Sequence, residues 1–169
     1  ARGLQEQVLD ELPQAFSGLE PPISILVPAY NEEASIVASV GSMLQLSYPQ
    51  FEIIVINDGS ADATLERLRE AFDLERFPQA VNERLPTQAV RGIWRSRTHA
   101  HLRVIDKVNG GKADSLNAGI NLARHPLFCG VDADSVLARD SLHRVVRPFL
   151  RDPRVVARGG TVRVANGCD

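Results

Sequence analysis

Two aspartates, Asp132 and Asp134, stand one residue apart directly after a short apolar run, Leu127 to Val131. A few apolar residues followed at once by polar groups are typical of a buried strand in an α/β protein. Ligands of open α/β sheets bind at the carboxyl ends of strands, and carboxylate oxygens suit Mg²⁺ or Mn²⁺ beside substrate phosphates. The pattern fits a metal–phosphate site and, equally well, a polar loop whose aspartates cap the next helix.

Three other apolar runs also end in polar residues: 23–27 before Pro28-Ala-Tyr-Asn-Glu32, 51–56 before Asn57-Asp-Gly-Ser60, and 102–106 before Lys107-Val-Asn-Gly-Gly-Lys112. Because the carboxyl ends of parallel strands share one edge of a sheet, we expect these segments to meet there. Clustered carboxylates repel each other unless a cation compensates. Gly110-Gly111 would let backbone N–H groups approach an anion at a helix start. The parts suit a nucleoside diphosphate with a divalent metal.

Each of these signals also has an ordinary structural explanation. Asp58-Gly59 and Gly110-Gly111 are turn signals in their own right. Lys112 can be a solvated lysine of a first helical turn, and Glu32 can serve only the helix dipole. Their joint placement at successive strand ends is what favours a site.

The elements that must position these residues alternate along the chain. Asn31 is expected to cap a helix whose first turn holds Glu32 and Glu33. Further helices are expected after residue 60, after Lys112 and after Asp140, with a last strand between residues 155 and 164. This βαβαβαβαβ order predicts an α/β, Rossmann-like fold with a mostly parallel, doubly wound sheet and helices on both faces.

We expect two parts in the chain: a helix and linker over residues 1–22, and a nucleotide-binding domain over residues 23–169. Residues 73–101 show no clear periodicity and end rich in arginine, so we interpret them as an inserted, solvated basic loop rather than a surface for an anionic partner.

Composition excludes several classes of function. A net charge of -2 over 169 residues gives no general attraction to nucleic acid, and two cysteines are too few for a disulfide framework. We recognise no membrane span and no signal peptide. Since the chain has no initiator methionine, we expect it to be a piece of a longer protein.

Common nucleotide and hydrolase motifs are missing from the sequence. It has no G-x-G-x-x-G, no G-x-x-x-x-G-K-[ST] and no G-x-S-x-G, and its histidines lack zinc-ligand spacing. Asp132-Ala-Asp-Ser-Val136 does fit the D-x-D-x-[TV] pattern of haloacid-dehalogenase-type phosphatases. It stands after the fourth expected strand, whereas that motif normally follows the first.

Taken in order, the motifs resemble those of family 2 glycosyltransferases, which have a GT-A fold. The resemblance runs from Ile23 to about Val164, and it looks most like the membrane-bound polysaccharide synthases. It is carried by Val27-Pro-Ala-Tyr-Asn-Glu32, Ile56-Asn-Asp-Gly-Ser60, Asn109-Gly-Gly-Lys112 with Leu116-Asn-Ala-Gly119, and Val131-Asp-Ala-Asp134.

The resemblance implies a role for each matching residue. Glu32 and Asp58 would contact the nucleoside of a nucleoside-diphosphate sugar, within a wall formed by Pro28, Ala29 and Tyr30. Lys112 would lie near the diphosphate, Asp132 near the ribose or sugar, and Asp134, with Asp132 beside it, would hold Mg²⁺ or Mn²⁺.

The implied reaction is inverting transfer from a donor, with a UDP-sugar favoured, to a hydroxyl of a glycan or lipid-linked acceptor. It would take place at the cytoplasmic face of a membrane that only segments outside this chain contact. The family's acidic base and its Q-x-x-R-W motif are missing here, so we expect the base beyond Asp169. A non-catalytic nucleotide-binding domain is the alternative.

Overall fold

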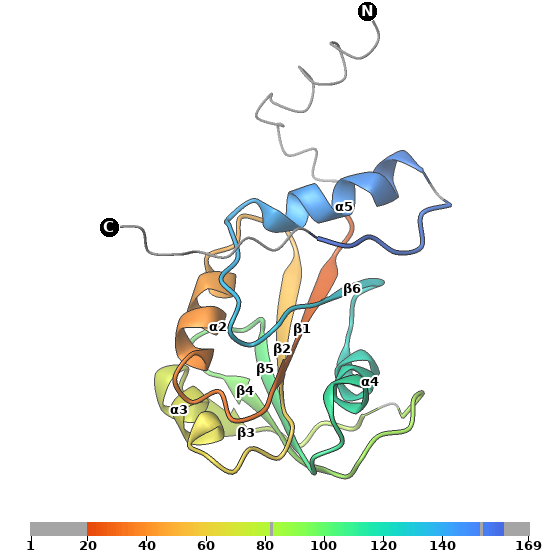
Figure 1. The fold of residues 1–169 in the computed structure, drawn as a ribbon. Coiled ribbons are helices and arrows are strands. Elements are labelled where there is room, and N and C mark those ends of the chain that lie inside the picture. The colour runs from red at the N-terminus through yellow and green to blue at the C-terminus, as the bar shows by residue number, and fades with distance from the viewer. Residues whose placement is uncertain (1–19, 82, 153, 161–169) are drawn as a thin grey trace, which may run out of the picture.

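The computed structural model describes residues 20–81, 83–152 and 154–160, and within them a six-stranded sheet lies between helices (Figure 1). The strands are β1 (Ile23–Ala29), β2 (Phe51–Asn57), β3 (Leu74–Arg76), β4 (Val90–Ser96), β5 (Leu102–Lys107) and β6 (Leu127–Gly130). The helices are α2 (Ile36–Leu44), α3 (Thr64–Ala71), α4 (Lys112–Leu122) and α5 (Ser141–Arg151).

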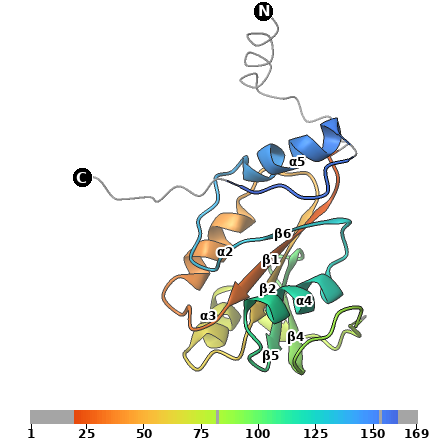
Figure 2. The same cartoon turned by 45° about the vertical axis from the view of Figure 1, so that its right-hand side comes forward.

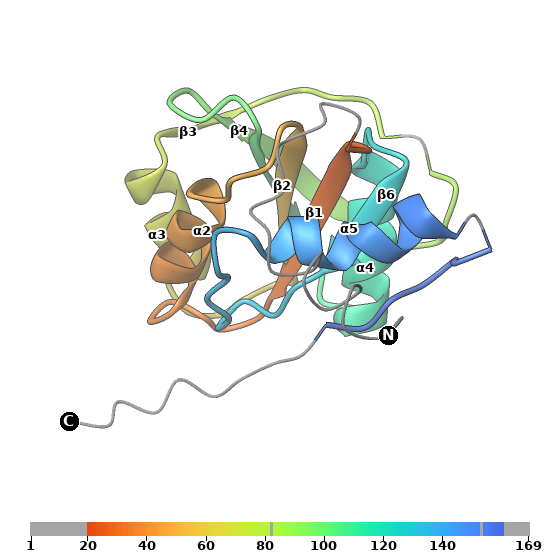
Figure 3. The ribbon, with the colours of Figure 1, turned by 90° about the horizontal axis from the view of Figure 1, so that it is seen from above.

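The strand order is β3-β4-β5-β2-β1-β6. Strands β5, β2, β1 and β6 run parallel to one another, and β4 pairs antiparallel with both β3 and β5. Helices α2 and α3 cover one face of the sheet and α4 covers the other (Figure 3). Helix α5 lies across the end at which β1 and β2 begin (Figures 1 and 2). The prediction of a mostly parallel α/β fold with helices on both faces is confirmed.

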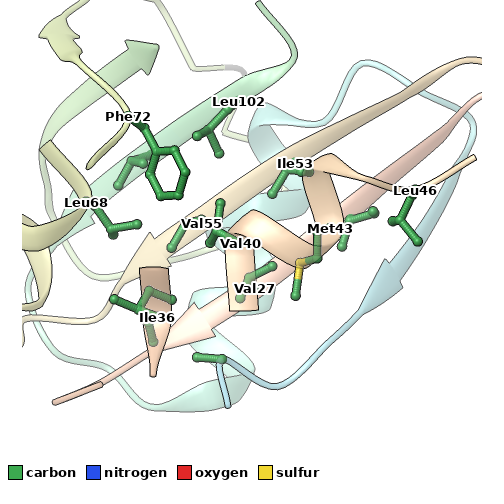
Figure 4. Close-up of a cluster of buried hydrophobic side chains, with 14 of the residues drawn as sticks. Val27, Ile36, Val40, Met43, Leu46, Ile53, Val55, Leu68, Phe72 and Leu102 are labelled. Carbon is green, nitrogen blue, oxygen red and sulfur yellow. The ribbon is translucent and has the colours of Figure 1, made fainter. Parts of the chain in front are cut away.

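Both faces of β1 and β2 are buried, which explains their nearly unbroken apolar sequences. On one face, Val27 and Val55 pack against Ile36 and Val40 of α2 and Leu68 of α3 (Figure 4). The other face packs against α4. The sheet is thereby fixed from both sides, and the loops at its carboxyl edge start from rigid positions.

Helix α4 approaches the sheet closely because Gly119 has no side chain. A Cβ at Gly119 would lie 3.0 Å from Leu26 Cδ2 and 3.1 Å from Ile56 Cδ1. The helix can therefore pack its backbone directly on these two strands, which sets the distance between α4 and the sheet.

The expectation of an irregular basic loop over residues 73–101 was wrong, because β3 and β4 lie within it. Ile93 and Ser96 are buried whereas Arg91 and Arg95 are exposed, so β4 is a strand that its neighbours cover only in part. Arg95 Nε lies 2.7 Å from Glu75 Oε1 on the partner strand. Arg95 and Arg97 thus pair with carboxylates of neighbouring segments.

Helix α2 begins at Ile36, four residues later than expected. Asn31 has φ +56°, and it stands in a turn together with Glu32 and Glu33. The predicted capping role of Asn31 is therefore wrong. The turn brings these polar residues over the carboxyl edge instead of placing them within α2.

Three other expectations need correction or cannot be compared. Among the described strands β6 lies at the edge of the sheet, and its Phe128 is 54% exposed, so the prediction of a buried strand was wrong. Residues 155–160 form no strand, and residues 161–164 lie outside the described residues. The expected helix over residues 1–22 falls almost wholly outside them as well. No helix in the described ranges is long and apolar enough to cross a bilayer.

Candidate functional site

Loops from four parallel strands meet at the carboxyl edge of the sheet, which is the lower end in Figure 1. The loop after β1 is joined to the loop after β2 by backbone-to-side-chain hydrogen bonds. Asn31 N donates to Ser60 Oγ (3.0 Å), Ala61 N donates to Asn31 Oδ1 (2.8 Å), and Glu32 N donates to Thr64 Oγ1 (2.9 Å). The two loops therefore act as one unit.

The residues predicted to form the nucleoside wall follow one another along β1 and its loop. Ala29 is buried, Pro28 is partly buried, and Tyr30 is 53% exposed, so its ring is available to a ligand. Glu32 is partly buried, and its Oε2 accepts a hydrogen bond of 2.6 Å from Ser35 Oγ. This bond fixes the carboxylate without removing its remaining acceptor positions.

Asp58 is only 3% exposed, and both its carboxylate oxygens are used inside the protein. Oδ1 accepts from Lys107 Nζ (2.5 Å) and Gly110 N (3.0 Å), and Oδ2 accepts from Gly111 N (2.7 Å). Burial alone raises the pKa of Asp58, but these hydrogen bonds and the charge of Lys107 outweigh it and lower the pKa. The carboxylate is therefore ionised at neutral pH.

These contacts correct the interpretation of Gly110-Gly111. The two N–H groups were expected to bind an external anion, whereas here they bind the Asp58 carboxylate. Gly111 has φ +86°, a conformation that favours glycine, and a Cβ at Gly110 would lie 2.5 Å from Asp114 Oδ1. The glycines are thus required by the turn and by the close approach of Asp114.

Lys107 is the main feature that sequence reasoning missed. It is fully buried, and its ammonium contacts three acceptors: Asp58 Oδ1 (2.5 Å), Asp114 Oδ1 (2.6 Å) and Val108 O (2.7 Å). A signal was present in the sequence, because Lys107 shares the parity of Ile105 in β5 and therefore faces α4. A lysine placed there needs acceptors from that helix or from a neighbouring loop.

Lys112 and Asp132 are brought together across the site, with Lys112 Nζ 2.5 Å from Asp132 Oδ1. Both side chains are exposed to more than half of their surface. Lys112 is the first residue of α4, whose amino terminus has no side-chain cap. The exposed pair therefore lies beside N–H groups that have no partner within the helix.

Asp134 stands at the start of a loop that is fixed to α2. Ser39 Oγ donates to Ser135 O (2.7 Å), and Ser135 N donates to Asp132 O (3.0 Å). Asp134 itself is exposed, and no hydrogen bond or ion pair of its carboxylate occurs within the described residues. A rigid loop thus presents an available carboxylate to solvent.

Asp132 and Asp134 fit a divalent cation only in combination with further ligands. No group of three or more His, Cys, Asp or Glu side chains in the described part of the chain could hold a metal by itself. Mg²⁺ commonly uses one or two carboxylates and fills its other positions with substrate phosphates and water. The hard oxygens of these two aspartates match that chemistry.

The sequence model of glycosyl transferase family 2 matches residues 24–167. The chain belongs to glycosyltransferase family 2. This membership confirms the resemblance found in the motifs, and it rejects the phosphatase interpretation of Asp132-Ala-Asp134, which required another family.

Characterised relatives of this family 2 chain include poly-β-1,6-N-acetyl-D-glucosamine synthases. The protein from Staphylococcus epidermidis is 32% identical over 144 residues, which are 85% of this chain and 29% of that protein. The protein from Staphylococcus aureus (strain COL) is 29% identical over 145 residues, again 29% of its length. The chain thus spans less than a third of these relatives.

Solved structures share the GT-A fold with this chain. A mannosyltransferase from Pyrobaculum calidifontis, PcManGT in complex with GDP-Man and Mn²⁺, has a TM-score of 0.63, at 22% identity over 90% of this chain and 39% of its own. TarS 1-349 from S. aureus in complex with UDP-GlcNAc has a TM-score of 0.58, at 21% identity over 83% of this chain and 37% of its own. The predicted fold is confirmed.

Proposed function

We propose that this chain is the donor-binding part of a metal-dependent, inverting glycosyltransferase that uses a nucleoside-diphosphate sugar, with a UDP-sugar as the first candidate. The observation that carries the proposal is the ion pair between Lys112 and Asp132 beside the start of α4, which has no side-chain cap. Asp134, two residues after Asp132, is exposed. A diphosphate needs this combination of cation, helix N–H groups and carboxylates that can hold a metal.

The nucleoside is assigned to the joined loops after β1 and β2. Tyr30 offers an exposed ring for the base, with Pro28 and Ala29 behind it, and Glu32 offers a carboxylate for ribose hydroxyls. Among the described residues Asp58 Oδ2 accepts one hydrogen bond, from Gly111 N, which leaves it a second lone pair for an N–H donor of the base. Uracil carries such a donor, as the other bases also do, so this contact admits a uridine nucleotide without selecting it.

The diphosphate is assigned to the first turn of α4. Lys112 would exchange its exposed ion pair with Asp132 for a phosphate oxygen, and the helix N–H groups would donate to the same anion. Asp132 would then be released towards the ribose or the sugar. Exposed ion pairs contribute little, typically under about 1 kcal/mol, so this exchange costs little.

A divalent ion at Asp134, with Asp132 beside it, would neutralise the charge that develops on the leaving diphosphate. The chain's own part is to fix that carboxylate, through Ser39 and Ser135, at the edge where the diphosphate lies. Backbone N–H groups and Lys112 add stabilisation of the same charge.

Transfer with inversion further requires a base that takes the proton of the acceptor hydroxyl. We place that base beyond Asp169, together with the glycan or lipid-linked acceptor site and any contact with the cytoplasmic face of a membrane. The polysaccharide synthases that this chain resembles are more than three times as long as the matched part, which supports this division.

Calorimetric titration of the 169-residue chain with UDP, GDP and UDP-GlcNAc, with and without Mn²⁺, tests the proposal. We expect UDP to bind only with Mn²⁺, and Asp134→Ala to weaken binding at least tenfold. Asp140→Ala is the matched control, because Asp140 is an exposed carboxylate that pairs, among the described residues, with Arg144 on α5 alone. Metal-independent binding, or no binding to a folded sample, would overturn the proposal.

A further inference from the structure

We infer that Lys107 is a positioning residue for the nucleotide site: by binding Asp58 and Asp114 it holds the Gly110–Gly111 turn and the start of α4 in the arrangement that receives the donor. The inference rests on the proposed function and adds a residue that lies outside the four family motifs. Lys107 itself touches no ligand, because it is fully buried below the turn.

The ammonium of Lys107 is compensated by three oxygens. It donates hydrogen bonds to Asp58 Oδ1 and Val108 O, and it forms an ion pair with Asp114 Oδ1 at 2.6 Å that lacks hydrogen-bond geometry. A buried charge is tolerated only where such counter-charges and acceptors surround it. Without the ammonium, the Asp58 and Asp114 carboxylates would face each other with no cation between them, and they would move apart.

Movement of either carboxylate would move the glycine turn. Gly110 and Gly111 donate their N–H groups to Asp58, and Gly110 lies so close to Asp114 that a Cβ would collide with its carboxyl group. The residue after this turn is Lys112. A continuous series of contacts therefore runs from the buried Lys107 to the exposed Lys112.

Asp114 extends the same network to a loop on the surface. Its Oδ2 accepts a hydrogen bond of 2.9 Å from Gln88 N. The neighbouring residues 84–86 are tied to α4 by Asn117 and Asn121. Asp114 thus holds the outer loop with one oxygen and the buried ammonium with the other, which restricts how far the start of α4 can shift.

β5 supplies a matched control for Lys107. Arg103 lies on the same face of the same strand, is also buried, and pairs with one carboxylate, Glu52, at 2.5 Å. It lies near the opposite end of the sheet, where it also donates to Leu122 O. Arg103→Met and Lys107→Met therefore each remove one buried cation, but only Lys107→Met does so below the glycine turn.

The test compares wild type, Lys107→Met and Arg103→Met as full chains, by UDP titration with Mn²⁺ and by amide hydrogen exchange at Gly110 and Gly111. We expect Lys107→Met to weaken UDP binding at least tenfold and to accelerate exchange at both glycines. Both variants should lower the thermal midpoint of unfolding, because each removes a buried cation. Arg103→Met should nevertheless leave the UDP affinity of the folded protein and the hydrogen exchange of the two glycines near the wild-type values.

Asp114→Asn keeps the test decisive if Lys107→Met does not fold, because it preserves the side-chain shape and the Lys107–Asp58 pair. We expect this variant to show the same two changes to a smaller extent. Unchanged exchange and affinity in a folded Lys107→Met or Asp114→Asn protein, or an equal loss in Arg103→Met, would overturn the inference.

Failure of the proposed function can be told apart from failure of the inference. If folded wild type binds no nucleotide, the proposed function fails, and hydrogen exchange alone decides the role of Lys107. Faster exchange at Gly110 and Gly111 in Lys107→Met then supports its control of the turn, and unchanged exchange overturns it.

Discussion

Arg103 and Lys107 lie on the same face of β5 and hold opposite ends of α4. Arg103 donates to Leu122 O at the last residue of the helix (3.1 Å), and Lys107 pairs with Asp114 in its first turn (2.6 Å). The helix is therefore fixed at both ends by one strand. Its first residue, Lys112, has a defined position even though its side chain is exposed.

Replacing Lys112 with methionine should weaken binding of UDP without affecting uridine. The lost charge-assisted contact with phosphate is worth about 1.5 kcal/mol or more, which corresponds to about a tenfold loss. Calorimetric titration with UDP and with uridine measures the two affinities. Arg154→Met, which removes an exposed arginine paired with Asp152, is the control. Equal losses for uridine and UDP would argue against a phosphate contact.

Glu52→Gln should destabilise the protein strongly. Glu52 Oε1 accepts from Ser24 Oγ and Arg124 N, and Oε2 pairs with Arg103, all near the end of the sheet opposite the site. Removing its charge leaves Arg103 buried without a counter-ion, at a cost of about 3–5 kcal/mol in the free energy of unfolding. Urea unfolding measures this loss.

The control for this variant is Glu75→Gln, which breaks the exposed ion pair with Arg95 and should cost less than about 1 kcal/mol. Similar losses in Glu52→Gln and Glu75→Gln would contradict a strong contribution of the buried Glu52–Arg103 ion pair to stability.

Gly119→Ala should lower the free energy of unfolding by about 1–3 kcal/mol, because its Cβ would collide with Leu26 and Ile56. Gly41→Ala is the matched control in α2, where nothing lies within 4 Å of an added Cβ. There the change should stabilise by about 0.5–1 kcal/mol, since alanine is the better helix former. Thermal and urea unfolding of both variants measure these changes. Equal effects of the two substitutions on the free energy of unfolding would contradict the close packing of Gly119.

Stability should fall as acid is added, through the carboxylates of Glu52 and Asp58. Burial raises the pKa of Glu52, but its hydrogen bonds and Arg103 outweigh this and lower it, as for Asp58. The unfolded chain therefore takes up protons first, with pKa values of roughly 4. The stabilisation is complete above that pH, shrinks as pH falls below it, and is lost below the folded values.

Urea unfolding between pH 6 and pH 3 measures this dependence. Glu52→Gln should show a shallower slope, because one of the two groups no longer titrates. An unchanged slope in this variant would mean that Glu52 does not have the lowered pKa.

Strand ends were predictable because they depend on local sequence. The apolar runs before Pro28, Asp58 and Asp132 end where the structure ends or nearly ends its strands, so the meeting of their loops followed from parallel topology. β3 and β4 were missed because their pairing is non-local. Arg95 of β4 and Arg97 just after it pair with Glu75 and Asp73, which no periodicity within residues 90–97 indicates.

The start of α2 and the role of Lys107 were missed for a related reason. Asn31 has the composition of a helix cap, yet its side chain accepts from Ala61 on another loop. Lys107 looks like a solvated residue at a strand end until α4 is placed over it. In each case a polar side chain finds its partner in a segment far along the chain, which local patterns do not contain.

β1 pairs with β2 on one side and with β6 on the other, so the first of the six described strands pairs with the last of them in sequence. Pairings between such distant segments form late, because the loop-closure entropy must be overcome first. Asp132 and Asp134 follow β6 directly. The chain should therefore gain its affinity for metal and for nucleotide in one step, when β6 pairs with β1. Until that pairing forms, a newly synthesised chain would not bind the donor.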